Sequence, residues 1–239
     1  MRTNHKENQN ILITGGNRGL GLAMIEILLR KGHKVCTIIR KKSEGLQSLS
    51  KKYDDQINIF NGDVTDEKSI KKAIYEISRI MEQIDILINN SAVHLDPERL
   101  PIEQVDFSVY SRTFEVNSTG PLIVIKHALP LIRKGRKKMI VNISSEAGSV
   151  SNSWRKSEYA YCMSKSALNM ASSILQNYLK EEGIKVLALH PGWFSSDMGG
   201  KEAPITPMDA ALQVIDLLLK QFDLEDPVYY GPDGKVMDW

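Results

Sequence analysis

The sequence predicts a single-domain α/β protein with a doubly wound, mainly parallel seven-stranded sheet and helices on both faces of the sheet. Three observations lead to this fold class. Short, continuously apolar segments such as residues 11–13 are typical of strands buried on both faces. They alternate with longer segments of helical periodicity, which favours parallel strands joined by right-handed crossovers. The length of 239 residues fits one such domain, and the sequence contains no internal repeat or linker.

The first strand, turn and helix form the unit around which the chain is organised. The apolar segment 11–13 is followed by a glycine-rich turn, and a helix follows over 20–29 and ends at Gly32. A helix N-terminus offers unpaired N–H groups and a positive dipole end, and glycines let the backbone approach an anion closely. The spacing Thr-Gly-x-x-x-Gly-x-Gly over 14–21 therefore predicts a phosphate site. The alternative is a glycine-rich turn that binds no ligand.

The remaining elements alternate along the chain. We expect further strands at 34–39, 57–60, 84–88, 139–143, 185–189 and 228–230. We expect further helices at 43–53, from residue 66 onward, and at 105–133, 158–182 and 208–222. Thr65 is expected to cap the helix that starts at residue 66, because a threonine side chain can accept a hydrogen bond from the first helical turn. Gly183 is expected to end the helix over 158–182.

The composition argues against several classes of function. The formal net charge of +2 provides no long-range field, so we expect no nucleic-acid partner. No apolar run reaches the length of a membrane span, so we expect no membrane partner. Cys36 and Cys162 match no metal or redox spacing, so we expect no metal, and a reducing cytoplasm is the default location. Residues 1–9 are polar and are expected to be a frayed or disordered tail, which leaves 10–239 as the domain.

Polar clusters collect where the predicted strands end. In open parallel sheets, ligands bind beyond the carboxyl ends of the strands. The clusters at these ends are residues 14–21, Arg40, Asp63 with Val64, residues 89–92, Ser144 with Ser145, and residues 191–196. Packing alone does not explain polar side chains gathered at one end of apolar strands, so the sequence predicts a ligand site there.

Tyr161 and Lys165 are the sharpest candidates for chemistry. Residues four apart share one face of a helix. A phenol has an ordinary pKa of about 10, and a neighbouring ammonium favours the phenolate, so such a pair can donate and accept protons near neutral pH. The alternative is a surface pair without function. Tyr159 is a poorer candidate, because four residues further on it meets Met163.

Taken together in this order, the motifs resemble those of the short-chain dehydrogenase/reductase family over about residues 10–239. The motifs are residues 14–21, 89–92, Asn117, Ser145 with Gly148, Tyr161 with Lys165, and residues 191–196. Finer similarities, at 159–165, 190–193, 197–200 and 233–239, point to the branch of C-factor and Sniffer-like carbonyl reductases. The resemblance implies a Rossmann-type fold and hydride transfer between a nicotinamide and a carbonyl.

The resemblance also implies the roles of individual residues. It implies that Tyr161 is the acid/base, Ser145 binds the substrate carbonyl, Lys165 holds the ribose, and Asn117 holds a water in a proton relay. The implied cofactor-binding residues are Gly15, Asn17, Arg18, Gly19, Leu20, Gly21, Arg40, Asp63, Val64, Asn90, Ser91, Tyr161, Lys165, Pro191, Gly192, Phe194 and Ser196. The chain departs from the family pattern at Ser91, Ala92 and Ser196, and the sequence leaves open whether Ser144 or Ser145 contacts the substrate.

Basic residues at the end of the second strand predict NADPH rather than NADH as the cofactor. A carboxylate at this position would accept a hydrogen bond from the ribose 2′-hydroxyl, whereas guanidinium pairs well with a 2′-phosphate. Arg40 occupies the position, residues 41–42 are lysines, and Arg18 lies in the glycine turn. The alternative is an ordinary solvated run of charge.

The expected function is NADPH-dependent reduction of a small-molecule carbonyl to an alcohol. A dehydrogenase working in the oxidative direction and a non-catalytic NADP(H) sensor remain alternatives. We expect His190 and Cys162 to be packing residues, and the segment 193–207, with its aromatic and glycine residues, to close over an apolar or aromatic substrate. The sequences of the loops 93–101, 150–156 and 194–207 do not identify the substrate. The resemblance also implies a homodimer or homotetramer paired through the two long helices, although some family members are monomers.

Overall fold

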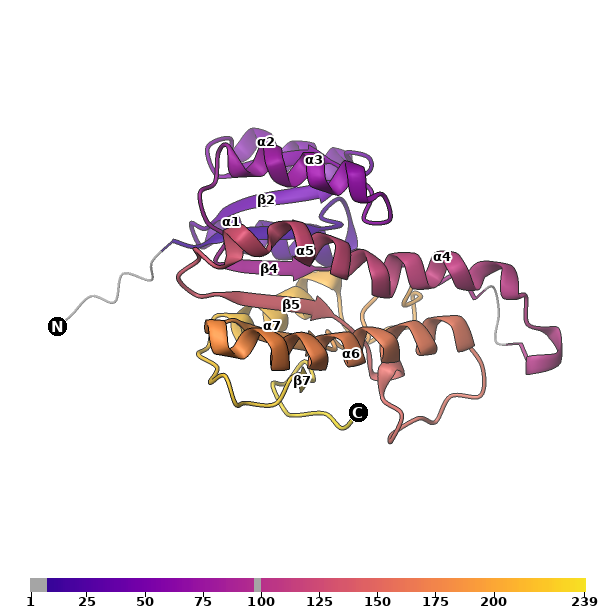
Figure 1. Cartoon of the computed structure of the whole chain (residues 1–239). Coiled ribbons are helices and arrows are strands. Elements are labelled where there is room, and N and C mark those ends of the chain that lie inside the picture. The colour runs from indigo at the N-terminus through magenta and orange to yellow at the C-terminus, as the bar shows by residue number, and fades with distance from the viewer. Residues whose placement is uncertain (1–7, 97–99) are drawn as a thin grey trace.

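The computed structural model describes residues 8–96 and 100–239, and its centre is one parallel sheet (Figure 1). The sheet has seven strands in the order β3-β2-β1-β4-β5-β6-β7, and every neighbouring pair is parallel. The strands are β1 (Asn10–Thr14), β2 (Lys34–Ile39), β3 (Ile57–Asn61), β4 (Ile86–Asn89), β5 (Met139–Ile143), β6 (Lys185–Leu189) and β7 (Tyr229–Tyr230). The strand order reverses between β1 and β4, which confirms the predicted doubly wound fold and creates a crevice at the carboxyl ends of these strands.

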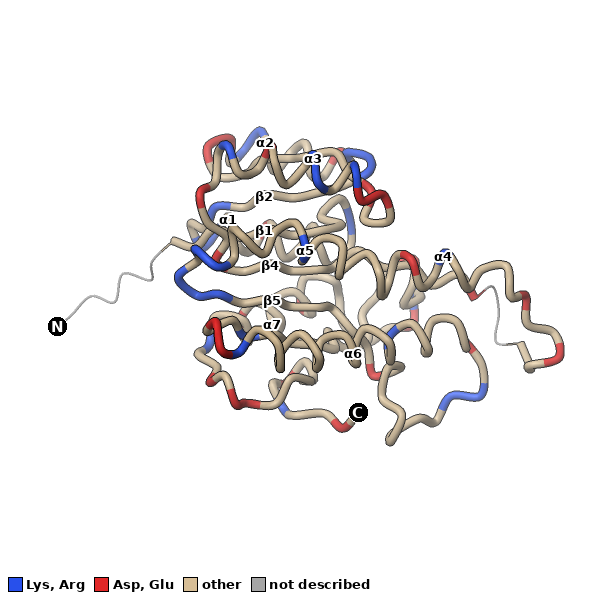
Figure 2. Tube along the Cα trace, viewed as in Figure 1, with Lys and Arg blue, Asp and Glu red and all other residues tan. Residues whose placement is uncertain are grey.

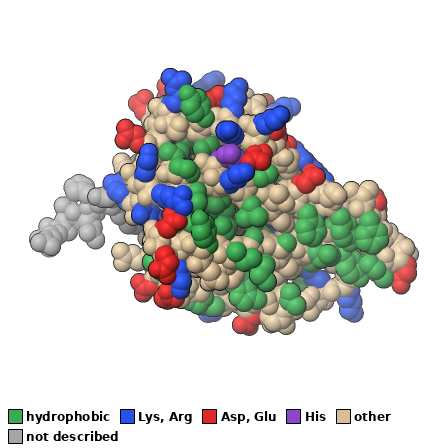
Figure 3. Space-filling model, in the orientation of Figure 1, with side chains coloured by type: hydrophobic (Ala, Val, Ile, Leu, Met, Phe, Trp, Pro, Cys, Tyr) green, Lys and Arg blue, Asp and Glu red, His purple; other side chains and the backbone are tan. Residues whose placement is uncertain are grey.

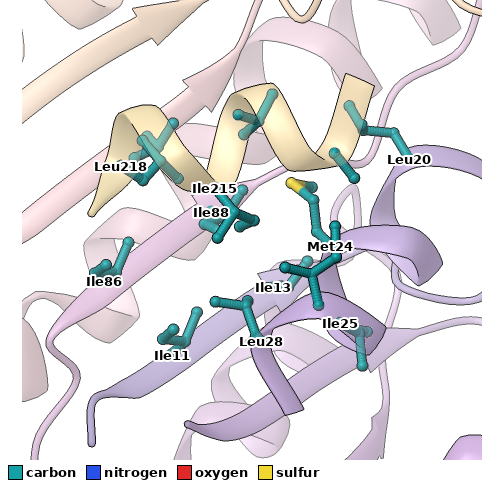
Figure 4. Packing of buried hydrophobic residues seen from close by; sticks show 14 of the residues in the cluster. Ile11, Ile13, Leu20, Met24, Ile25, Leu28, Ile86, Ile88, Ile215 and Leu218 are labelled. Atoms are coloured by element: carbon teal, nitrogen blue, oxygen red, sulfur yellow. The ribbon is translucent and has the colours of Figure 1, made fainter. Parts of the chain in front are cut away.

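Helices cover both faces of the sheet. One face carries α1 (Gly19–Arg30), α2 (Glu44–Lys52) and α7 (Pro207–Leu218). The other face carries α3 (Glu67–Ser78), α4 (Tyr110–Phe114), α5 (Gly120–Ile132) and α6 (Tyr159–Leu179). The strands are therefore apolar on both sides: Ile11 and Ile13 face the first group, whereas Leu12 faces the second. Figure 4 shows Met24 of α1, Ile215 of α7 and Ile88 of β4 among the side chains that fill the first core.

Most predicted elements are confirmed to within a few residues, and the differences have local causes. Helix α3 is capped by Asp66 rather than by Thr65, so this prediction was wrong. The Asp66 carboxylate accepts hydrogen bonds from the N–H groups of Lys68 and Ser69, whereas the Thr65 hydroxyl donates to Asp63 Oδ1 at 2.9 Å. Gly183 ends the α6 region in a left-handed conformation, with φ of 71°, as expected.

The long helix expected over 105–133 is not one regular helix. Short 3-10 turns at Ile102–Gln104 and Phe107–Val109 precede α4, and a wider π-helical turn at Glu115–Thr119 joins α4 to α5. Insertions of this kind often mark functional sites, and Asn117 lies inside this one. Figure 1 shows that α4 and the start of α6 extend past the carboxyl ends of the strands. Arg112 of α4 and Tyr161 of α6 line the cavity at this end of the sheet.

The surface carries charges of both signs. Figure 2 shows lysine, arginine and acidic residues interspersed along the chain, as the small net charge implies. Figure 3 shows apolar side chains on the face covered by α5 and α6, where Leu122, Met170, Ile174 and Tyr178 are exposed. Residues 1–7 of the expected tail and 97–99 of the expected loop 93–101 lie outside the described residues.

Candidate active site

A cavity of about 810 Å³ lies at the carboxyl ends of the strands. It extends from the glycine turn after β1, past the ends of β2 and β4, to the N-terminal part of α6 and the segment after β6. Every cofactor-binding residue implied by the resemblance lines this cavity, and so do Ser145, Tyr161 and Lys165. Asn117 is the one predicted catalytic residue that does not line it.

The glycine turn has the shape of an anion site. Gly15 and Gly19 have φ values of 72° and 53°, which side chains rarely adopt. A Cβ atom on Gly21 would lie 2.4 Å from Gly15 O, so the turn requires glycine there as well. Arg18 at the N-cap of α1 makes no side-chain cap, which leaves N–H groups of the first helical turn facing the cavity. Asn90 braces this shape, because its Nδ2 donates to the carbonyl oxygen of Gly15 at 3.1 Å.

Basic groups surround Asp63 beneath the end of β2. Arg40 Nη1 lies 3.9 Å from Asp63 Oδ2, and Arg112 Nη2 lies 3.2 Å from the same oxygen. Burial alone would raise the pKa of Asp63, but hydrogen bonds from Thr65 and Arg112 outweigh it and keep the pKa below its ordinary value. Sequence reasoning missed Arg112, because nothing in a helical repeat shows which side chain will reach a strand end. Arg18 forms an ion pair with Asp197 at the opposite wall of the cavity.

Tyr161 and Lys165 lie on one face of α6, where Lys165 is buried and Tyr161 is half-buried at the cavity. Lys165 Nζ donates a hydrogen bond to the carbonyl oxygen of Ile143 at 2.8 Å and lies 5.7 Å from the centre of the Tyr161 ring. Burial lowers the pKa of Lys165 to about 8 and raises the pKa of Tyr161 to about 12. Burial is the largest cause of the raised pKa of Tyr161, and the groups that lower this pKa are Ser145 and Arg155 rather than Lys165, so the expected acidification of the phenol by the ammonium is not seen. Tyr161 therefore keeps its proton at neutral pH, as a proton donor must.

The structure separates the two serines at the end of β5. Ser144 Oγ donates to Asn169 Oδ1 at 2.6 Å inside the fold. Ser145 is the serine that hydrogen-bonds Tyr161, and its hydroxyl also donates to Glu146 Oε2 at 2.6 Å. Ser145 is thus the serine whose hydroxyl shares the catalytic end of the cavity with the Tyr161 phenol.

Asn117 lies behind the cavity wall. Its Nδ2 donates to the carbonyl oxygen of Val93 at 2.8 Å and to Ser164 Oγ at 3.0 Å, and its Oδ1 accepts from the N–H group of Val93 at 2.8 Å. The side chain therefore ties the segment after β4 to helix α6. Its part in a proton relay stays a prediction.

Charged residues that sequence reasoning missed line the cavity near Ser145. Arg155 pairs with Glu146 and with Glu158, the N-cap residue of α6. Burial would raise the pKa of Glu146, but hydrogen bonds from Ser145 and Arg155 outweigh it and lower the pKa. His190 Nδ1 lies 3.7 Å from Glu146 Oε2, and burial lowers the pKa of His190, so its imidazole is neutral. Glu146, Arg155 and Glu158 lie in or beside polar loops, where no periodicity could reveal them. His190, which we expected to be a packing residue, lines the cavity at the end of β6.

The segment after β6 is ordered by its own hydrogen bonds. Trp193 is 57% exposed and its Nε1 donates to the carbonyl oxygen of Gly199 at 2.8 Å, so it is not a core residue. Phe194 pairs with Ile205 and packs against the first core. Cys162 on α6 is half-buried, and burial raises the pKa of its thiol to about 11, as fits the expected packing residue.

Comparison with known proteins identifies the family. Residues 9–205 match the family model of short chain dehydrogenases. The chain belongs to the short-chain dehydrogenase/reductase family. It is an oxidoreductase, and the resemblance stated from its motifs is confirmed. The described residues include no helix that is both long and apolar enough to cross a membrane.

Relatives and solved structures narrow the comparison. An uncharacterised oxidoreductase of Schizosaccharomyces pombe is 34% identical over 90% of this chain and 84% of its own length. The C-signal protein of Myxococcus xanthus is 38% identical over 56% of this chain and 81% of its own length. The structure of the carbonyl reductase Sniffer of Drosophila melanogaster has a TM-score of 0.91 and 29% identity, over 98% of this chain and all of that one. An NADPH-bound carbonyl reductase from chicken fatty liver has a TM-score of 0.87 and 29% identity, with the same coverage.

Proposed function

We propose that this family member is an NADPH-dependent reductase that converts a small-molecule aldehyde, ketone or diketone to an alcohol. One observation carries the proposal: the protonated phenol of Tyr161 and the hydroxyl of Ser145 meet at one end of a cavity whose other end is a glycine turn shaped for phosphate. The chain's relation to carbonyl reductase structures supports it. In this proposal residues 10–239 act as one domain that contains both the cofactor and the substrate site.

The residues present fit a dinucleotide. The glycine turn and the first turn of α1 would hold its phosphates, Asp63 and Val64 would contact its adenosine, and residues 191–196 would surround its nicotinamide. NADPH bound in this way supplies the hydride. Lys165, whose ammonium already donates to Ile143 O, would hold the ribose hydroxyls beside Tyr161.

The proton chemistry belongs to the chain itself. Tyr161 and Ser145 would hydrogen-bond the carbonyl oxygen, where negative charge develops in the transition state. Tyr161 would then give its proton to that oxygen. Lys165 and Asn117 would link Tyr161 to solvent on the side of α6, with Asn117 fixing the segment after β4 through its hydrogen bonds to Val93.

A preference for NADPH over NADH rests on the residues around the end of β2. Arg40 is 66% exposed on the side chain and stands at the mouth of the cavity together with Lys41. No carboxylate occupies the position at the end of β2. Asp63, two residues beyond the neighbouring strand β3, is paired with two guanidinium groups. The 2′-phosphate would displace Asp63 from Arg40, because it carries more charge and more acceptor oxygens than one carboxylate.

The substrate end of the cavity favours an aromatic carbonyl. Trp154 and Trp193 line it and are both well exposed, and Met198 lies in the same wall. Arg155 is engaged by two carboxylates, so it is a poor partner for an anionic substrate. We therefore expect aromatic aldehydes, ketones or diketones to be better substrates than small polar carbonyls.

The alternatives are weaker. A sensor without turnover has no need of a phenol and a buried lysine on one helix face. A dehydrogenase working in the oxidative direction would use the same residues, and the chain's relation to carbonyl reductase structures favours reduction. We also propose a cytoplasmic enzyme, and a homodimer or homotetramer that buries the apolar face of α5 and α6 seen in Figure 3. The test of function is a panel of carbonyl compounds followed by NADPH absorbance. Absence of turnover with every aldehyde and ketone, despite tight NADPH binding, would favour the sensor.

A further inference from the structure

The last residues of the chain return to the catalytic end of the sheet. After β7 the backbone turns, with a hydrogen bond from Gly231 N to Lys235 O of 2.9 Å and a φ of 77° at Gly234. Val236 then pairs with Tyr230 in antiparallel fashion, and Met237 N donates to Tyr229 O at 2.9 Å. We call residues 236–239 the C-terminal clasp. The clasp runs toward the loop over 144–152, which we call the serine loop because it begins with Ser144 and Ser145.

Polar contacts fasten the serine loop to the clasp. Ser149 Oγ donates to Asp238 O at 2.8 Å, and Ser151 N donates to Trp239 O at 2.7 Å. Ser151 Oγ donates to the same oxygen at 2.5 Å, and Asn152 Nδ2 reaches Asp238 Oδ2 at 3.4 Å. Three residues of one loop thus donate to two residues that are nearly 90 positions away in the sequence.

An aromatic pair extends the connection to Ser145. The Trp239 ring stacks on the Tyr229 ring, with centroids 5.2 Å apart and planes 16° from parallel. Tyr229 is fully buried, and its hydroxyl donates to the carbonyl oxygen of Ser145 at 2.6 Å. Burial raises the pKa of Tyr229 to about 12, so its phenol stays a donor across the working pH range. Trp239 is therefore connected to the backbone of Ser145 through the side chain of Tyr229 alone.

The other side of the serine loop rests on helix α6. Gly148 O accepts hydrogen bonds from Asn169 Nδ2 and Ser166 Oγ, both at 3.1 Å. The loop is therefore held between the helix that carries Tyr161 and the clasp. Catalytic groups must be held to within about half an ångström of their working positions. Without the clasp, the contacts with Asp238 and Trp239 at residues 149–152 would be lost, and Tyr229 would lose the ring that stacks on it while it holds Ser145.

We propose that the clasp positions Ser145 against Tyr161, with Trp239 and Asp238 as positioning residues for carbonyl reduction. This inference rests on the proposed function of Ser145 in binding the carbonyl oxygen. It assigns the chain's last four described residues a role in the chemistry of a site more than 70 residues earlier in the sequence.

Three variants of the full chain test the proposal. Trp239→Ala removes the stack, Trp239→Phe keeps an aromatic ring on Tyr229, and Tyr229→Phe keeps the stack but removes the hydrogen bond to Ser145. Tyr75→Ala is the matched control, because it truncates an exposed aromatic residue on α3. For each we would measure the NADPH dissociation constant, kcat and KM for an aromatic aldehyde that the wild type reduces, and hydrogen exchange over 145–152.

We expect Trp239→Ala and Tyr229→Phe to lower kcat about three- to tenfold, which is the effect of losing one aromatic pair or one hydrogen bond. The NADPH dissociation constant should stay within about twofold of the wild-type value. Exchange over 145–152 should quicken in both, and Trp239→Phe should restore most of kcat. Tyr75→Ala should match the wild type. Faster exchange with unchanged kcat would overturn the positioning role, and unchanged exchange in Trp239→Ala would overturn the clasp itself. If the wild type reduces no carbonyl, the proposed function fails, whereas the exchange data still decide whether the clasp holds the loop.

Discussion

Replacing Tyr161 by phenylalanine removes one oxygen and its proton from the catalytic end of the cavity. The ring would stay packed beside His94, whose ring centroid lies 4.5 Å away, so the fold should be retained. The carbonyl oxygen would lose its proton donor and one of two hydrogen bonds, while Ser145 would still offer the other. General acid catalysis contributes about 10²- to 10⁴-fold, so kcat should fall by that factor, or about 3–5.5 kcal/mol of barrier.

The assay is steady-state NADPH oxidation with an aromatic aldehyde, together with NADPH titration and a thermal melt of each variant. Tyr159→Phe is the matched control, because Tyr159 begins the same helix but does not line the cavity. We expect it to keep most of the activity. The reasoning would be refuted if Tyr161→Phe retained more than about a tenth of wild-type kcat, a loss too small for a lost general acid. Equal losses in both variants would refute it as well.

Three further predictions concern the cofactor and the proton path. Arg40→Asp should reduce the ratio of NADPH to NADH affinity by about tenfold. This is the lower end of the effect expected for a charge-assisted contact, because the Arg40 side chain is largely exposed. Equal affinity of the wild type for both cofactors in a titration would refute the NADPH assignment. Burial lowers the pKa of Lys165 to about 8, so its ammonium is present below that pH and is lost above it. The value of kcat/KM for reduction should therefore be level near neutrality and decline above about pH 8. A pH profile that is still level at pH 10 would contradict the role assigned to Lys165. Gly21→Ala would place a Cβ atom 2.4 Å from Gly15 O, so it should lower the free energy of unfolding by about 1–3 kcal/mol and weaken NADPH binding. A thermal melt and an NADPH titration that both match the wild type would show that the turn is not as tight as described.

The fold could be predicted because this sheet is buried on both faces. Strand β5 (Met139–Ile143) has helices above and below it, so four of its five residues are apolar and only the buried Asn142 interrupts the run. Its ends could therefore be predicted to within a residue. Helix ends were harder to predict, since Thr65 and Asp66 are both good caps and only the contact of Thr65 with Asp63 decides between them. The π-helical turn around Asn117 has no sequence signature that a periodicity of 3.6 residues would show.

Site residues could be predicted where they follow strands or share a helix face. The residues from Gly15 to Gly21 lie at a strand end, and Tyr161 and Lys165 lie on one face of α6. Arg112 and Arg155 could not be found in this way, because Arg112 reaches the cavity from the short helix α4 and Arg155 reaches it from a polar loop. The contacts of Trp239 with the serine loop are equally hidden, since they join segments that only the folded chain brings together.

The closeness of Gly148 to α6 limits how the substrate site can be altered by mutation. A Cβ atom on Gly148 would lie 2.8 Å from Asn169 Nδ2 and 2.9 Å from the backbone carbon of Lys165. A larger side chain there would push directly on the helix turn that carries Lys165. Trp154 and Trp193, by contrast, line the cavity with most of their surface open to solvent. A library meant to change the accepted carbonyl should therefore vary these two tryptophans and leave residues 147–149 untouched, because new shapes at the mouth do not disturb the backbone that aligns Ser145 with Tyr161.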